Sequence, residues 1–128
     1  MRILISAALI IVGVIHLLPL SGVLGNKQLE TLYALSFTDP NLSILMRHRA
    51  VLFGLLGLFF LLAAFQPQYQ PVAFVAGFVS VVSFLWLALD VGGYNAQVAR
   101  VFRADIIALV CLIIGVVAYI YEQSRQIP

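Results

Sequence analysis

Long apolar runs separated by short polar segments dominate the pattern of this sequence. A helix that crosses the hydrocarbon core of a bilayer needs about 20 mostly apolar residues. Four segments reach or approach this length, and they are residues 3–24, 42–65, 72–89 and 98–121. We therefore predict an all-α, polytopic membrane protein with a single domain over residues 1–128. In this prediction, the four transmembrane helices form a bundle of two packed helical hairpins.

Capping signals indicate where the second and fourth helices begin. Asp39 directly precedes Pro40, which is the preferred order of an N-cap residue and a proline in the first helical turn. The second helix would then run from Pro40 to Phe65, about 39 Å at 1.5 Å per residue. Asn95 offers a similar cap to the last helix. In the first connection, residues 27–35 are expected to form a short interfacial helix.

Small residues recur along one face of the second and fourth predicted helices, at alternating steps of four and three. Such steps keep side chains on one side of a helix. Lipid provides no hydrophobic force between helices, so small faces allow the close approach on which packing depends. The two faces consist of Ala50, Gly54, Gly57, Leu61 and Ala64, and of Ala104, Ala108, Cys111, Gly115 and Ala118. They align at one constant offset, for which internal duplication and chance are both open explanations.

The composition excludes most other classes of protein. Hydrophobic residues make up 63% of the 128 residues and charged residues 9%, whereas a soluble domain is roughly half apolar and about a quarter charged. A chain of this length cannot bury so much apolar surface in water. We therefore exclude a soluble domain, a disordered chain and a nucleic-acid-binding module, and we predict a multi-pass protein of the cell (inner) membrane.

The few charged residues gather toward one side of the predicted bundle. Because successive helices alternate in direction, the ends of the first and third helices and the starts of the second and fourth meet the same leaflet. Ionisable groups inside a membrane are costly, and they tend to face the protein interior and to be functional. The candidate ligand-binding layer consists of His16, Arg47, Arg49, Asp90, Arg100, Arg103 and Asp105.

Helical periodicity refines the orientation of this layer. His16 and Asp90 lie on small-residue faces of their helices, so we expect both to point inward. On the second helix, the position of the small-residue face predicts that Arg47 points inward. The alignment of the two small-residue faces instead predicts that Arg49 does, and the sequence leaves this choice open. Asp105 is expected to meet one of these two arginines.

The chemistry of the layer favours binding over catalysis. We predict no metal site and no resident cofactor, with haem held by His16 and His48 as the alternative, because helical bundles hold cofactors between facing helices. The leading hypothesis is a binding or accessory protein whose layer faces lipid phosphate or an anionic ligand, since the planar fork of arginine suits phosphate. Two alternatives stay open, namely a membrane enzyme or redox component that uses His16 on a lipid or quinone, and a small oligomeric transporter.

The expected partners follow from the same properties of the chain. Membrane lipids come first, and assembly into a homo-oligomer or a larger membrane complex is the second expectation. No nucleic-acid partner is expected.

Five short segments resemble a group of small bacterial four-span membrane proteins of unknown function: His16-Leu-Leu-Pro19, Asp39-Pro-Asn41, Met46-Arg-His-Arg-Ala50, Gly92-Gly-Tyr-Asn95 and Arg103-Ala-Asp105. The helix count and the arginine-bearing second helix are also similar to the DoxX-like membrane superfamily, which implies a loose link to redox or membrane homeostasis. Some members of the first group are labelled phosphopantetheine adenylyltransferase. Such an enzyme has a soluble nucleotide-binding α/β fold with a Gly-His phosphate motif, which this sequence lacks, so that activity is not expected.

Overall fold

Helices make up the fold of the computed structural model, which describes residues 1–20, 25–33 and 39–126. The elements in chain order are α1 (Arg2–Leu17), α2 (Asn26–Tyr33), α3 (Pro40–Phe65), the short 3-10 helix η2 (Pro67–Tyr69), α4 (Gln70–Val91) and α5 (Ala96–Gln126). These described residues contain no strand. The prediction of an all-α protein is therefore confirmed.

Four stretches of helix are long and apolar enough to cross a membrane. They are Arg2–Leu20, Pro40–Phe65, Pro67–Val91 and Ala96–Gln126. Large apolar side chains such as Ile3, Val79 and Leu89 stand exposed along these stretches, each with more than half of its surface accessible. Apolar surface of this extent is unusual for a soluble monomer. The length and apolarity of the helices therefore fit a membrane-spanning protein.

The predicted capping residues close the helices as expected. The side chain of Asp39 accepts a hydrogen bond from the backbone N–H of Asn41 at 2.9 Å, at the start of α3. Asn95 accepts one from the N–H of Val98 at 2.9 Å, at the start of α5. Each bond satisfies a backbone donor that the first helical turn leaves without an internal partner.

The first helix and the first connection differ in part from the prediction. The α-helical geometry of α1 ends at Leu17, because Pro19 lacks a backbone N–H and its ring crowds the preceding turn. The chain continues as a 3-10 turn over residues 18–20, and residues 21–24 lie outside the described part. The short helix expected at 27–35 is present as α2, with positions 34 and 35 outside the described residues.

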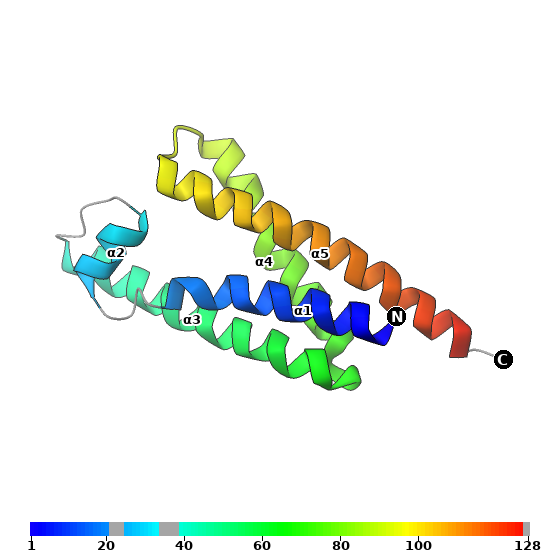
Figure 1. Ribbon diagram of the computed structural model, residues 1–128. Helices are drawn as coiled ribbons and strands as arrows, with labels where there is room; N and C mark the ends of the chain where they lie inside the picture. The colour runs from blue at the N-terminus through cyan, green and yellow to red at the C-terminus, as the bar shows by residue number, and fades with distance from the viewer. Residues whose placement is uncertain (21–24, 34–38, 127–128) are drawn as a thin grey trace.

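Helix α1 lies between α3 and α5 and packs along both of them, while α4 packs along α5 (Figure 1). Glycines allow the closest of these approaches. A Cβ atom added to Gly57 would lie 2.9 Å from the carbonyl oxygen of Gly13 and 2.8 Å from Cγ of Leu17. One added to Gly115 would lie 3.0 Å from Cβ of Ala8. The small-residue faces predicted for the second and fourth helices thus contact α1.

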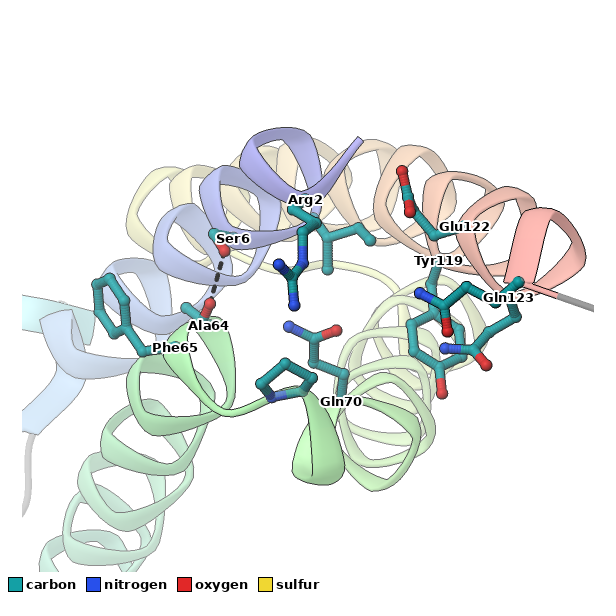
Figure 2. A pocket seen from close by; sticks show the side chains of 11 residues that line it. Arg2, Ser6, Ala64, Phe65, Gln70, Tyr119, Glu122 and Gln123 are labelled. Atoms are coloured by element: carbon teal, nitrogen blue, oxygen red, sulfur yellow. Dashed lines mark hydrogen bonds between the residues drawn. The ribbon is translucent and has the colours of Figure 1, made fainter.

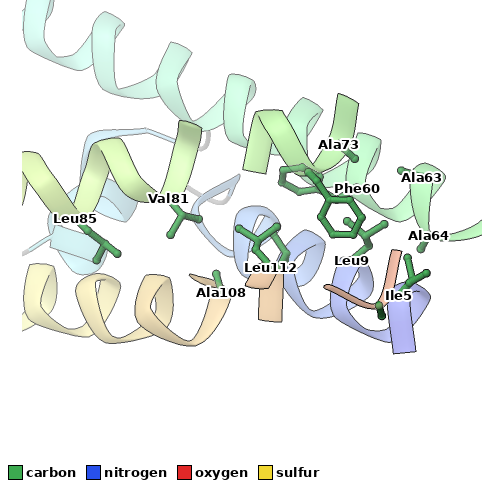
Figure 3. Packing of buried hydrophobic residues seen from close by; sticks show 13 residues of the cluster. Ile5, Leu9, Phe60, Ala63, Ala64, Ala73, Val81, Leu85, Ala108 and Leu112 are labelled. Atoms are coloured by element: carbon green, nitrogen blue, oxygen red, sulfur yellow. The ribbon is translucent and has the colours of Figure 1, made fainter. Parts of the chain in front are cut away.

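The apolar core occupies the middle of the helices, and side chains from α1, α3, α4 and α5 build it (Figure 3). The largest fully buried side chains in it are Phe60, Leu9, Leu112, Val12 and Val81. Two cavities lie toward the opposite ends of the helices, beyond this core.

The α1–α3 contact generates a stability prediction. We expect Gly57→Leu to lower the free energy of unfolding by about 1–3 kcal/mol, because the added side chain must displace Leu17 or separate two backbones. Thermal unfolding in mild detergent measures the change. Ala7→Leu, at an exposed position of α1, is the matched control and should leave the midpoint near that of the parent. Equal midpoints for both variants would contradict the close contact.

Candidate functional site

A cavity of about 300 Å³ lies at the end of the helices that is distant from the N-terminus of the chain, next to α2 (Figure 1). We call it the loop-side pocket, and all five α-helices contribute to its walls. Its lining combines apolar side chains with four members of the predicted polar layer. These four are His16, Arg49, Arg100 and Asp105.

Arg49 is held at the pocket by two aromatic neighbours. It donates a hydrogen bond from a guanidinium nitrogen to the hydroxyl oxygen of Tyr33 at 2.7 Å. The centre of its guanidinium group lies 4.4 Å from the ring centroid of Phe53 and 5.6 Å from that of Tyr33. A cation over an aromatic face at such distances is attracted to the ring. The structure thus places Arg49 in the pocket, whereas Arg47 is exposed and does not line it.

Asp105, in the third turn of α5, is the one carboxylate among the described residues that line the pocket. It is only 9% exposed, and it forms no hydrogen bond with any described residue. Arg49 is near enough to interact with it electrostatically, in agreement with the expected approach to an arginine of the second span. Arg100 lines the same pocket from α5. Two arginines and one carboxylate thus line the pocket, and their summed formal charge is positive.

His16 forms the inner wall of the pocket and is 2% exposed. Its Nδ1 lies 2.9 Å from the carbonyl oxygen of Val12. Because a carbonyl only accepts, Nδ1 carries the hydrogen. Nε2 lies 2.8 Å from Oγ of Ser80, so the hydroxyl donates to Nε2 of the neutral ring. The rings of Phe53 and Phe60 pack beside it, with centroids 5.6 Å and 4.9 Å away.

The haem alternative would require His16 and His48 to face a common space. Both nitrogens of His16 are engaged, as described above, and His48 is exposed on α3 and does not line the loop-side pocket. Within the described residues, no group of three or more His, Cys, Asp or Glu side chains is arranged to hold a metal ion. The structure thus brings no pair of histidines together at this site.

Three members of the predicted layer lie outside the loop-side pocket: Arg47, Asp90 and Arg103. The expectation that Asp90 points inward is wrong, since Asp90 is exposed. The buried face of α4 advances in steps of four through Ala73, Gly77, Val81 and Leu85. Asp90 follows Leu85 by five positions, which places it about 140° around the helix from Leu85 at 100° per residue.

Tyr33 is a pocket residue that sequence reasoning missed. Its hydroxyl accepts from Arg49, and its backbone carbonyl accepts from the side-chain amide of Asn95 at 2.7 Å. The last residue of α2 thus joins α3 to the start of α5. Gln97 also lines the pocket and was not predicted. Nothing in the local sequence around either residue indicates these contacts, because they arise only when three separate segments meet.

Comparison with known proteins identifies no relative of this chain. No protein-family model matches the chain, and neither the curated proteins nor the solved structures give a match. The resemblances noted from the sequence therefore stay predictions.

The His16–Ser80 contact generates a prediction about stability. We expect Ser80→Ala to lower the free energy of unfolding by about 1 kcal/mol, because buried Nε2 loses its hydrogen-bond donor. In a His16→Phe background, the same change should cost much less, since no buried nitrogen is left unpaired. Unfolding of the four proteins in detergent gives this double-mutant cycle. Ser83→Ala, at an exposed position of α4, is the control. Equal costs of Ser80→Ala in both backgrounds would refute the interaction.

Proposed function

We propose that this protein is a binding or accessory protein of the membrane, and that its loop-side pocket receives the phosphate of an amphipathic anionic ligand, with membrane phospholipids as the first candidates. The observation that carries the proposal is that two arginines, Arg49 and Arg100, line a largely apolar cavity together with a single carboxylate among the described residues, that of Asp105. A site with excess positive charge and apolar walls suits a ligand with a phosphate and a hydrocarbon chain.

The chemistry of arginine supports phosphate as the recognised group. A guanidinium has five N–H donors in a planar fork that matches phosphate oxygens. Among the described residues, Arg49 has one hydrogen bond to a protein group, the hydroxyl of Tyr33, so most of its donors are open to a ligand within this part of the chain. Arg100 has no hydrogen-bond or ion-pair partner among the described residues. The stacking of Arg49 on Phe53 holds its fork in place before a ligand arrives.

The remaining walls of the pocket suit the apolar part of such a ligand. Leu18, Phe84 and Val101 line it together with Ile15 and Leu32. For the wider arrangement, we propose a bundle of two hairpins in the bacterial inner membrane, with α2 at the interface. The pocket would then lie at the level where lipid head groups meet hydrocarbon, so that a phospholipid could enter without leaving its leaflet.

A membrane enzyme or redox component acting on a lipid or quinone, as the DoxX-like resemblance implies, is the second candidate. Asp105 favours it, because this buried carboxylate lacks a hydrogen bond to any described residue and could accept one from a ligand hydroxyl. The hydrogen bond between His16 and Ser80 argues against an enzyme that uses His16, because the ring must break this bond before it can act as an acid or base. We therefore rank phosphate binding first.

Native mass spectrometry of the protein with phosphatidylglycerol in mild detergent tests the proposal. We expect Arg49→Gln and Arg100→Gln each to weaken retention of the lipid about tenfold, which corresponds to the loss of one charge-assisted hydrogen bond. Arg103→Gln is the matched control, because Arg103 is an exposed arginine of the same helix as Arg100 but does not line the pocket. Its retention should equal that of the parent.

Two results would contradict this proposal. One is equal weakening by Arg103→Gln and Arg100→Gln, which would indicate unselective attraction of anionic lipid to surface charge. The other is unchanged retention in the Arg49→Gln/Arg100→Gln double variant. Thermal unfolding of every variant confirms that it is folded before its lipid binding is compared.

A further inference from the structure

A second cavity, of about 520 Å³, lies at the opposite end of the helices (Figure 2). We call it the terminal-side pocket. The start of α1, the end of α3, the start of α4 and the end of α5 form its walls. None of its lining residues belongs to the predicted polar layer, and none lines the loop-side pocket.

Most of the described residues that line this pocket have polar side chains, in a chain that has few polar groups. Its polar side chains include Arg2, Gln70, Tyr119, Glu122, Gln123 and Gln126. Arg125 lies at the same end but outside the lining, and its guanidinium centre is 5.8 Å from the ring centroid of Tyr121. The pocket therefore gathers both an arginine and a glutamate from this end of the molecule.

Side chains already satisfy the backbone carbonyls at the floor of the pocket. Ser6 donates to the carbonyl oxygen of Ala64 at 2.6 Å (Figure 2). Gln70, which is 6% exposed, donates from its amide nitrogen to the carbonyl oxygen of Ala63 at 3.1 Å. These bonds close the last turn of α3. They also fix the side chain of Gln70 in one orientation.

The amide oxygen of Gln70 is open to the pocket. It has no hydrogen-bond partner among the described residues, and within this part of the chain no polar side-chain atom is both buried and unpaired. The oxygen must therefore have access to the cavity. Because its amide nitrogen is hydrogen-bonded to the backbone, Gln70 presents its amide oxygen to a ligand in a fixed position.

Arg2 and Glu122 place opposite charges on this pocket. Figure 2 shows the guanidinium of Arg2 directed toward Gln70, while Glu122 lies on the side of the pocket away from Gln70. Neither has an ion-pair partner among the described residues. The pocket is thus close to neutral in formal charge, yet it offers a cation and an anion at separate places. This differs from the loop-side pocket, which is lined by two arginines and one carboxylate among the described residues.

We propose that the terminal-side pocket binds a zwitterionic phosphoethanolamine group, the head group of an aminophospholipid. Arg2 binds the phosphate, and the carboxylate of Glu122 accepts hydrogen bonds from the ammonium group. The open oxygen of Gln70 and the amides of Gln123 and Gln126 supply further polar contacts. The two ends of the protein then select different head groups, an anionic one at the loop side and a zwitterionic one at the terminal side.

Native mass spectrometry with equimolar phosphatidylethanolamine and phosphatidylglycerol of the same acyl chains tests this assignment. We expect Glu122→Gln to lower retention of phosphatidylethanolamine about tenfold and to leave phosphatidylglycerol unchanged, because only the ammonium contact is lost. Arg2→Gln should lower phosphatidylethanolamine to a similar extent. Arg125→Gln, outside the pocket, should leave retention of phosphatidylethanolamine at the parent level.

A competition experiment with soluble O-phosphoethanolamine distinguishes a lipid head group from a free soluble compound as the ligand of the terminal-side pocket. We expect the free compound to displace phosphatidylethanolamine only at a large excess, because it lacks the acyl chains. Displacement at equal concentration would assign the pocket to a soluble zwitterion with the same chemistry. Equal retention of both lipids by the parent, unchanged by Glu122→Gln, would overturn the proposal and leave phosphate binding at the loop-side pocket untouched.

Discussion

The close packing of α1 against α3 and α5 is the constraint on which the rest of the structure depends. Lipid offers no hydrophobic force between helices, so van der Waals contact must hold them together. Gly13 and Gly57 bring the backbones of α1 and α3 together, and Gly115 admits Ala8 of α1 against α5. These contacts lie near the middle of the helices. The charged side chains are concentrated toward the two ends, where the two pockets lie.

Several polar groups of the helices either form hydrogen bonds within the protein or line one of the two pockets. His16 is buried close to the α1–α3 contact, and the Val12 carbonyl and the Ser80 hydroxyl satisfy its ring. The groups with free hydrogen-bonding capacity, such as Asp105 at one end and the amide oxygen of Gln70 at the other, line a pocket. These oxygens reach a cavity, since no polar side-chain atom of the described residues is both buried and unpaired. They are therefore accessible to water or to a polar ligand.

Local signals predicted most of the fold but only part of the candidate site. The caps at Asp39 and Asn95 and the glycine at position 57 act through neighbouring residues or through helical periodicity, and both are visible in the sequence. The choice of Arg49 over Arg47 depends on how α3 is rotated against its neighbours, and the exposure of Asp90 depends on which face of α4 meets α5. Those rotations arise from packing between distant segments, which periodicity within one helix does not determine.

The most direct test of the account is the distance between arginine nitrogen and lipid phosphorus in a bilayer. Solid-state NMR with ¹⁵N-labelled arginine measures it through ¹⁵N–³¹P dipolar coupling, and Arg49→Lys identifies the Arg49 signal by its loss. The account predicts that the guanidinium of Arg49, although it is half-buried and bonded to Tyr33, couples strongly to phosphorus. Coupling confined to the exposed Arg47 and Arg103, with none for Arg49, would contradict a phosphate site in the loop-side pocket.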